Sequence, residues 1–439
     1  MSQIEIYCKA PNLAEAETMI DRQNTRFPAQ GREWNELKQE LECLRQGDMK
    51  WTDLRNLKAS YNAGEALHEA SWAAYTMFSG DNYLYGNLLY PSLNKMAEDI
   101  TKMALEMLQA PDDGFATVTT GGTESITLAM RAAREHRLAK GPVNGQPEII
   151  APFSAHASLN KAANLLGAKV IRVPVVNFRS DVAAMEAAIS ENTIALFGSA
   201  PCYPFGCIDS ISELSSIAEN NGLWMHVDAC VGGFFLPWAR RIGREIPEFD
   251  FALPGVLSMS ADLHKYGYTA RGASLVLLRS EALAKEFQTL KFDEWPMGTF
   301  DALTVAGSRP GGAVASAWTV MNSLGTEGYE DLVRKICAAR DLMIDKISTI
   351  PGLKVAGEPE AGVMGIVGEN ETDMAAVRGE LSARGWRTGP LVQPQGFNIL
   401  LNQYHDQIID EFTDTLRDIV ETVGSAGAMA EYETESYGG

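Results

Sequence analysis

Residues 256–267 read VLSMSADLHKYG, a strand-like apolar run that ends in a polar segment carrying His264 and Lys265. The run has the length of a buried strand, so Lys265 is predicted to lie at a strand end, facing a cleft. A lysine amine there can be partly desolvated, lose its proton and attack a carbonyl group. The dipeptide alone is weak evidence, because a surface lysine would fit it equally well.

The same pattern recurs on both sides of this segment. Short apolar runs alternate with amphipathic stretches such as Thr123–Lys140. The runs are residues 116–120, 148–152, 169–175, 194–200, 223–228, 256–261 and 274–279. This alternation predicts an α/β domain with a mostly parallel seven-stranded sheet, whose functional residues gather at the C-terminal ends of the strands.

Three regions are predicted along the chain. Residues 1–70 are interpreted as an N-terminal helical extension, 71–328 as the large α/β domain and 329–439 as a small α+β domain. In the last region a long helical stretch, Tyr329–Ser348, precedes strand candidates at 353–356, 363–367 and 397–403.

Three further motifs follow strands. The segment His226-Val227-Asp228 places a carboxylate at a strand end, where a buried structural aspartate is the alternative; His226 is assigned a structural role. Gly121-Gly122-Thr123 opens a helix, and glycine there lets backbone N–H groups approach an anion. His156 follows the next strand, where an imidazole could stack on an aromatic ring or be an ordinary polar residue.

Together these motifs predict pyridoxal 5′-phosphate (PLP) as cofactor. Gly122 and Thr123 would hold its phosphate, His156 would stack on its ring, and Asp228 would keep the pyridine nitrogen protonated. Lys265 would carry it as a Schiff base, with His264 beside it. A zinc site of His156, His226 and His264 is disfavoured, because no two of them have a local ligand spacing.

Composition argues against several classes of partner. The chain has 439 residues, with 37 Lys plus Arg against 57 Asp plus Glu, a formal charge of −20. This charge disfavours nucleic acids and anionic membranes. No apolar stretch reaches the roughly 20 residues of a membrane helix. The six cysteines form no C-x-x-C pair and are predicted to be free thiols in the cytoplasm.

These motifs resemble the group II PLP-dependent decarboxylase-like family, and within it the sphingosine-1-phosphate lyases. The resemblance runs from about Gly47 to the C-terminal region. Its more specific marks are Val305–Gly312, Trp295-Pro296 upstream, and Lys265-Tyr266-Gly267-Tyr268 followed by the basic Arg271.

The resemblance implies PLP fold type I and a homodimer with shared active sites. It implies that Ser308 and Gly311 contact the cofactor phosphate of the partner subunit. It further implies that the phosphate of a small amine substrate is bound by Tyr61, Tyr203 and Arg271.

One departure concerns Asn87–Pro91. The lyases have a histidine where this chain has Tyr90, which can donate a hydrogen bond but carries no charge. An apparent insertion at Ser79–Tyr85 precedes it.

The predicted reaction is a retro-aldol cleavage of a phosphorylated sphingoid base, giving a long-chain aldehyde and phosphoethanolamine. Lys265, Tyr61, Tyr203 and the cofactor phosphate are candidate bases. Amino-acid decarboxylation is the alternative, because it needs the same cofactor residues. A non-catalytic PLP carrier is disfavoured by the joint presence of Lys265, Asp228 and His156.

Overall fold

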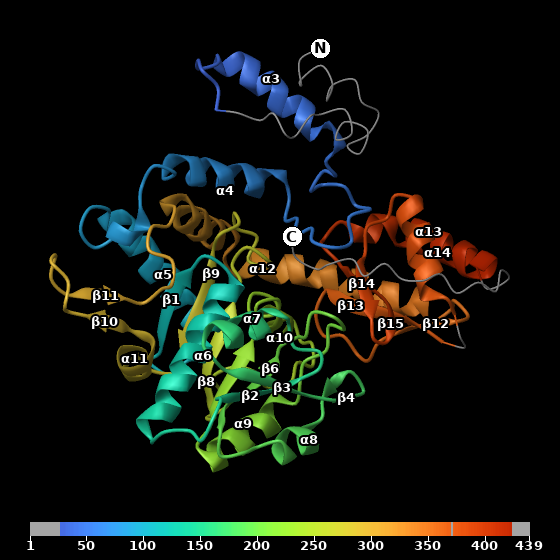
Figure 1. The fold of residues 1–439 in the computed structure, drawn as a ribbon. Coiled ribbons are helices and arrows are strands. Elements are labelled where there is room, and N and C mark those ends of the chain that lie inside the picture. Colours follow the sequence, from blue (N-terminus) through green and yellow to red (C-terminus); the bar gives the residue numbers. More distant parts are fainter. Residues whose placement is uncertain (1–26, 370–371, 424–439) are drawn as a thin grey trace. The chain divides into compact units, whose positions relative to one another are not determined.

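The computed structural model describes residues 27–369 and 372–423, and the chain divides into two compact units, Met1–Asn56 and Leu57–Gly439. In the first unit, the described residues form α3 (Trp34–Leu44) and η2 (Arg45–Gly47). The second unit contains every predicted site residue and the labelled elements from α4 onward (Figure 1).

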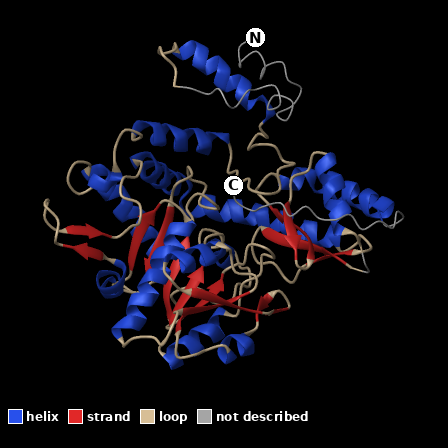
Figure 2. Cartoon of the chain, in the orientation of Figure 1, coloured by secondary structure: helices blue, strands red, loops and turns tan. Residues whose placement is uncertain are grey.

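A seven-stranded sheet forms the centre of the second unit (Figure 2). In spatial order it consists of β1 (Phe115–Thr119), β9 (Ser274–Leu278), β8 (Val256–Ala261), β7 (Trp224–Asp228), β6 (Thr193–Ser199), β2 (Glu148–Pro152) and β3 (Lys169–Val173). All pairs from β8 to β3 are parallel, and only β9 runs antiparallel to its two neighbours. The predicted mostly parallel sheet is therefore confirmed.

Strand direction brings the motifs to one edge of this sheet. Both β1 and β8 are antiparallel to β9, so they run the same way as each other. Because β7, β6 and β2 are parallel to β8, the C-terminal ends of all five strands lie together. The segments that follow these strands can therefore form one site although they are far apart in sequence.

Helices cover the sheet and pack against it through apolar side chains. Helix α6 (Gly122–Ala139) packs on it through Ile126, Ala129 and Ala133, which share a core cluster with Phe197 and Trp224 of the sheet. The other helices of the large domain are α4 (Glu65–Met77), η3 (Tyr83–Tyr85), α5 (Pro91–Met107), α7 (Ser158–Leu165), α8 (Val182–Ala187), α9 (Ile211–Asn221), α10 (Leu236–Arg241), α11 (Glu281–Leu283) and η4 (Ala284–Gln288).

The C-terminal part forms a second, antiparallel sheet. Its order is β12 (Leu353–Val355), β13 (Val363–Gly368), β15 (Gln395–Leu400) and β14 (Gly389–Val392), with α13 (Met374–Ala383), η5 (His405–Ile408) and α14 (Ile409–Val423) beside it (Figure 1). Two short hairpins complete the fold, β4 (Val175–Val176) with β5 (Arg179–Ser180) and β10 (Leu290–Phe292) with β11 (Phe300–Ala302).

The helix predicted at Tyr329–Ser348 is longer than its sequence pattern indicated. Helix α12 spans Gly311–Ile347 and changes direction at Gly325, whose φ is 53°. Its first turns, GGAVASA, are uniformly small and show no apolar periodicity, because Gly311 to Ala317 are buried on all sides. The proposed domain boundary after residue 328 therefore lies inside α12.

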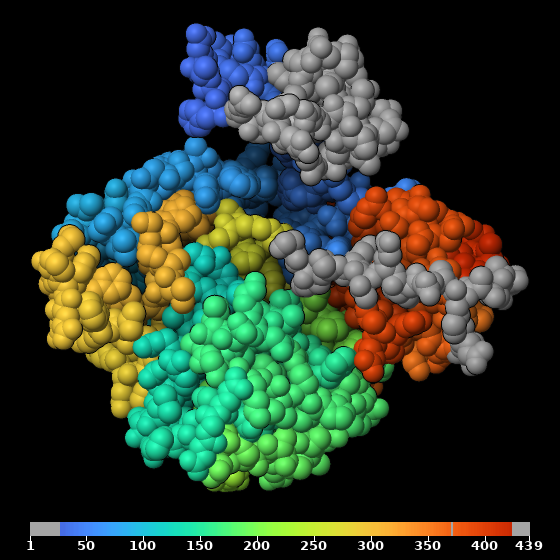
Figure 3. All heavy atoms as spheres, viewed as in Figure 1, coloured from blue at the N-terminus to red at the C-terminus, as the bar shows by residue number. Residues whose placement is uncertain are grey.

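The β10–β11 hairpin exposes large apolar side chains. Leu290, Phe292, Trp295, Met297 and Phe300 are all at least 40% exposed. Figure 3 shows the hairpin, in yellow, at the surface of the molecule. Contiguous exposed apolar surface of this kind often marks an interface.

The cysteine prediction is confirmed for four residues and wrong for one. Cys202, Cys207, Cys230 and Cys337 are buried free thiols. Cys43 is disulfide-bonded, which spacing could not reveal because a disulfide requires proximity in the folded chain. Cys8 lies outside the described residues.

Within the part of the chain that the structure describes, no helix combines the length and the apolar character needed to cross a membrane.

Candidate active site

A cavity of about 490 Å³ lies at the C-terminal edge of the large sheet. It is lined by eight of the predicted site residues, Gly122, Thr123, His156, Tyr203, Asp228, His264, Lys265 and Arg271. Strand direction explains why these residues meet. Each of them lies at or just after the end of a strand at this edge, or in the loop that enters the following strand.

Lys265 forms a close ion pair inside the cavity. Its Nζ lies 2.9 Å from Oδ2 of Asp262, a side chain that is only 3% exposed. Burial alone would lower the pKa of Lys265, but the neighbouring charges, Asp262 first, hold that pKa well above its usual value. The sequence predicted that desolvation would favour loss of the proton from Lys265. In the structure, the charges around the amine, that of Asp262 first, together outweigh desolvation and keep the amine protonated.

Asp262 is a site residue that the sequence reading missed. Burial raises the pKa of its carboxyl, but the charges of Lys265 and His264 outweigh burial and lower it. Its Oδ1 is buried and has no hydrogen-bond partner among the described residues. Its position three residues before Lys265 was the available signal, because a turn brings such residues together.

Asp228 is the last residue of β7 and is 7% exposed. Its Oδ1 accepts hydrogen bonds from the Cys230 backbone N–H at 3.1 Å and from the Ser260 hydroxyl at 3.3 Å. Behind it, burial lowers the pKa of His226 to about 4. His226 is therefore neutral and supports Asp228 through Ser260, whose Oγ lies 3.4 Å from its Nε2, which agrees with its predicted structural role.

The loop before α6 is shaped to approach an anion. A Cβ atom on Gly122 would lie 2.7 Å from the Cys230 sulfur and 2.9 Å from Oδ1 of Asp262, so only glycine fits. The N-terminus of α6, an 18-residue helix, opens into the cavity at Gly122 and Thr123. Its partial positive charge and free N–H groups suit a phosphate.

Glu124 fixes this loop and was not predicted. Its Oε2 accepts hydrogen bonds from the backbone N–H and the hydroxyl of Thr120, both at 2.7 Å. Its Oε1 accepts one from the Ala306 backbone N–H at 2.8 Å. A glutamate in the first turn of a predicted helix was the available signal.

His156 lies on the cavity wall with its ring held by Ser158. The backbone N–H of Ser158 donates to Nδ1 at 3.2 Å, and the Ser158 hydroxyl lies 2.8 Å from the same atom. Burial lowers the pKa of His156, so the ring is neutral and can stack on an aromatic group. His264 makes a different contact, donating from Nδ1 to the Ala273 carbonyl at 2.7 Å.

The residues predicted to bind substrate form one side of the site. The Tyr203 hydroxyl donates to the Lys58 carbonyl at 3.1 Å, and Arg271 donates to the Ala59 carbonyl at 3.3 Å. Tyr61 stands beside the cavity with its ring edge-on to Tyr266, their centroids 5.0 Å apart. Burial raises the pKa of Tyr61, so its hydroxyl keeps its proton.

Four predicted residues do not line this cavity: Tyr61, which stands beside it, and three others that lie elsewhere. Ser308 is exposed and accepts a hydrogen bond from Asn82 Nδ2 at 3.0 Å. Gly311 is buried, and a Cβ there would lie 2.6 Å from Leu93, which indicates a packing role within its own chain. Tyr90 stands directly before α5, outside the cavity.

The apparent insertion at Ser79–Tyr85 supports the Ser308 segment. The Tyr83 backbone N–H donates to the Arg309 carbonyl at 2.9 Å, and the Gly311 N–H donates to the Asp81 carbonyl at 2.8 Å. The Arg309 guanidinium lies over the Tyr83 ring, 4.6 Å from its centroid. The insertion therefore braces the start of α12.

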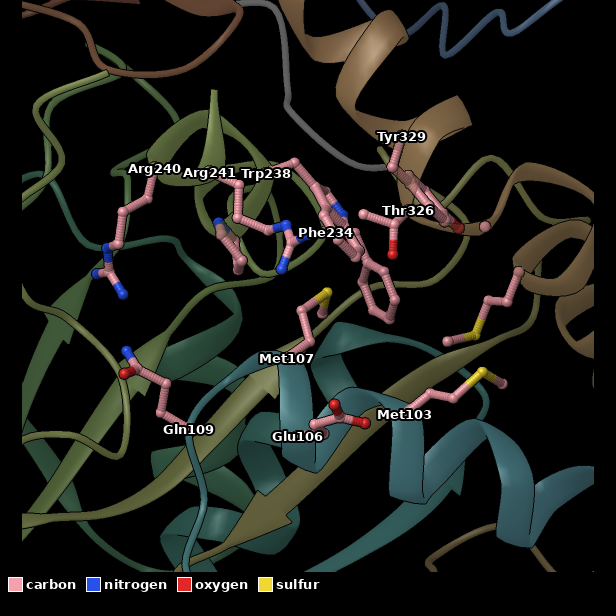
Figure 4. Close-up of a pocket in the computed structure, with 13 residues that line it drawn as sticks. Met103, Glu106, Met107, Gln109, Phe234, Trp238, Arg240, Arg241, Thr326 and Tyr329 are labelled. Carbon is pink, nitrogen blue, oxygen red and sulfur yellow. The ribbon is translucent and has the colours of Figure 1, made fainter. Parts of the chain in front are cut away.

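A second cavity of about 440 Å³ lies between α5, α10 and α12 (Figure 4). Its walls are mostly apolar or aromatic, with Met103, Met107, Phe234, Trp238 and Tyr329. It shares no lining residue with the lysine cavity and contains no lysine. The chemistry therefore places the active site at the sheet edge.

Among the described residues, no three His, Cys, Asp or Glu side chains are placed to hold a metal ion.

The lysine cavity fits PLP. It offers an amine for the aldehyde of PLP, a buried carboxylate for the pyridine nitrogen, a neutral imidazole for the ring and a helix N-terminus for the phosphate. Its volume lies in the usual range for small-molecule sites. The glycine cradle at Gly122 supports the same assignment, since a larger residue would fill it.

Comparison with known proteins agrees with this chemistry. Residues 17–365 match the pyridoxal-dependent decarboxylase conserved domain. The sphingosine-1-phosphate lyase of Oryza sativa subsp. japonica is 37% identical over 399 residues, which cover 89% of this chain and 73% of the relative. A probable L-aspartate decarboxylase of Pyrococcus furiosus is 32% identical over 369 residues, which cover 82% of this chain and 94% of the relative.

A solved structure extends the likeness to the fold. The sphingosine-1-phosphate lyase of Burkholderia pseudomallei has a TM-score of 0.86 and 32% identity, over 92% of this chain and 94% of that chain. The predicted PLP fold type I and the PLP cofactor are thereby confirmed. The chain belongs to the pyridoxal-dependent decarboxylase family and is a PLP-dependent lyase.

Proposed function

We propose that this chain cleaves the Cα–Cβ bond of a phosphorylated sphingoid base, releasing a long-chain aldehyde and phosphoethanolamine. The observation that carries the proposal is Arg271, an exposed arginine that lines the cavity and makes no ion pair with any described residue. The chain as a whole carries a charge of −20, so an anionic substrate group needs a local cation, and Arg271 can supply it. Its planar fork of donors suits a phosphate.

The cofactor side of the reaction follows from the cavity. Bound PLP supplies a ring that accepts the electron pair left on Cα when the bond breaks. Asp228 keeps the ring nitrogen protonated, and its two hydrogen bonds fix the orientation of its carboxylate. Lys265 would hold the cofactor covalently, and Asp262 would stabilise the charged form of the Lys265 amine when that amine is free.

A base must remove the proton of the substrate's β-hydroxyl. Tyr61 is poorly suited because its raised pKa keeps it protonated, and the Tyr203 hydroxyl already donates to Lys58. This leaves the cofactor phosphate and the Lys265 amine as bases; for Lys265 to act, its proton must first move to Asp262, 2.9 Å from its Nζ.

The test is direct. PLP-loaded protein is incubated with sphingosine-1-phosphate, and long-chain aldehyde and phosphoethanolamine are sought by mass spectrometry. Both products, absent with Lys265→Ala, would support the proposal. Carbon dioxide release from an amino acid without aldehyde formation would instead support the decarboxylase alternative. The similarity to the Pyrococcus furiosus relative is the observation behind that alternative.

Arg271→Ala is expected to raise KM for the phosphorylated substrate by about 10- to 100-fold, because a charge-assisted contact is worth roughly 1.5–3 kcal/mol. PLP absorbance should remain at the wild-type level, since Arg271 does not belong to the predicted cofactor set. Arg241→Ala, which removes a similarly exposed arginine at the second cavity, is the control. Loss of PLP absorbance in Arg271→Ala would assign the residue to the cofactor and contradict the proposed role.

We also propose a homodimer in which Ser308 completes the site of the partner. Support comes from the exposed Ser308 hydroxyl, which lies outside the cavity of its own chain, and from the exposed apolar β10–β11 hairpin. A protein that is monomeric by analytical ultracentrifugation and fully active under the same conditions would contradict this arrangement. The cytoplasmic location stays a prediction from composition.

A further inference from the structure

A short stretch of chain, Leu57–Asn62, contacts two side chains that line the active site; we call it the wall segment. The Tyr203 hydroxyl and the Arg271 guanidinium both donate to its backbone, at the Lys58 and Ala59 carbonyls. The two side chains proposed to meet the substrate phosphate are therefore oriented by the position of this backbone. Neither contact involves the cofactor residues.

The wall segment is held on its other side by the C-terminal sheet. The Leu57 N–H donates to the Arg387 carbonyl at 2.9 Å, and the Leu400 N–H at the end of β15 donates to the Leu57 carbonyl at 2.7 Å. Two residues further on, the Asn402 amide Nδ2 lies 3.2 Å from the Ser60 hydroxyl and 3.4 Å from the Ser60 carbonyl. Ser60 is 3% exposed and Asn402 is fully buried.

The orientation of Asn402 is itself fixed. Its side-chain oxygen accepts the Tyr404 N–H at 3.0 Å, which leaves the amide NH₂ directed at Ser60. Its backbone N–H donates to Nδ1 of the fully buried His405 at 2.9 Å. Because its backbone N–H and its side-chain oxygen are both hydrogen-bonded, the Asn402 side chain is held in one orientation toward Ser60.

We infer that Ser60 and Asn402 are positioning residues that act as one contact and set the substrate affinity of the site. The contact fixes the wall segment, and through its carbonyls it fixes Tyr203 and Arg271. The inference rests on the proposed role of these two side chains. The cofactor is held by the sheet edge, so it is independent of this contact.

The expected signature is a separation of substrate binding from cofactor binding. Ser60→Ala and Asn402→Ala should each raise KM by about tenfold, which corresponds to about 1.4 kcal/mol and to the loss of one buried hydrogen bond. The value of kcat should change less than threefold, and PLP absorbance should be unchanged. The double variant should match Asn402→Ala, because that variant already lacks the whole contact, whereas Ser60→Ala retains the Ser60 carbonyl.

Two controls separate positioning from general destabilisation. Ser215 is 2% exposed and accepts a hydrogen bond from the Gly255 N–H at 3.0 Å, away from the cavity. Ser215→Ala removes a comparable buried contact and should leave KM unchanged. Ser60→Thr retains the hydroxyl and should restore KM towards the wild-type value.

The closing experiment uses O-phosphoethanolamine as probe and follows the absorbance of bound PLP. Wild-type protein should show a saturable change, with Ser60→Ala and Asn402→Ala requiring about tenfold more probe. Equal affinities in wild type and variants would overturn the inference while leaving the proposed function intact. No response in wild type would overturn the phosphate grip of the proposed function and the inference that rests on it.

Discussion

Lys265→Ala is expected to lose the covalent bond to PLP and nearly all activity. Borohydride should fix PLP to wild-type protein, and peptide mapping should find it on Lys265, because this is the only lysine lining the cavity of the described residues. Loss of the amine removes both the attachment and a proton-transfer group, which alone contributes about 10²- to 10⁴-fold.

Lys285→Ala serves as the control for this prediction. Lys285 is exposed and pairs with Glu281 at 2.8 Å, remote from the cavity, so its loss should change neither labelling nor rate. Borohydride labelling of a different lysine in the wild type would contradict the assignment of the active site. Retention of full activity by Lys265→Ala would do so as well.

Asp228→Asn is expected to lower kcat by about 10²- to 10⁴-fold while PLP remains covalently bound. The amide keeps the shape of the carboxylate and can still accept from Cys230 and Ser260, so folding should survive. It removes the negative charge that keeps the ring nitrogen protonated. Breaking such a buried charge pair costs about 3–5 kcal/mol, and each 1.4 kcal/mol is tenfold in rate.

A second buried aspartate provides the matched comparison. Asp250 is fully buried and pairs with Arg240 at 3.1 Å, outside the lysine cavity. Asp250→Asn should reduce the melting temperature without reducing kcat by more than about twofold. A wild-type kcat in Asp228→Asn would show that Asp228 is structural, the alternative that its sequence context left open.

The strands of the large sheet were predictable because each is a short apolar run closed by a polar turn. Residues 148–152 and 256–261 coincide with β2 and β8, and the other five runs differ from their strands by one or two residues. The small hairpins were not predicted, because β4 and β5 have two residues each and β10 is exposed throughout. Such elements bury little apolar surface and leave no periodic signal.

The placement of the candidate cofactor residues around one cavity was predictable for a related reason. Asp228 ends a strand, and Lys265, His156 and Gly122 follow theirs; parallel strands bring such positions to one edge whatever their separation in sequence. Asp262 and Glu124 lie within the same motifs but were missed. Their importance depends on what they contact, since Glu124 reaches Ala306, 182 residues away.

The sequence by itself predicted the order of strands and helices along the chain, the candidate cofactor residues and the edge of the sheet at which those residues meet. Those features depend on local apolar patterns and on strand direction. Only the tertiary structure decided the charge state of Lys265, since Asp262 reverses the effect of burial. It alone also showed that Asn402 bonds Ser60, a contact 342 residues apart, because distant polar groups pair only after the chain has folded.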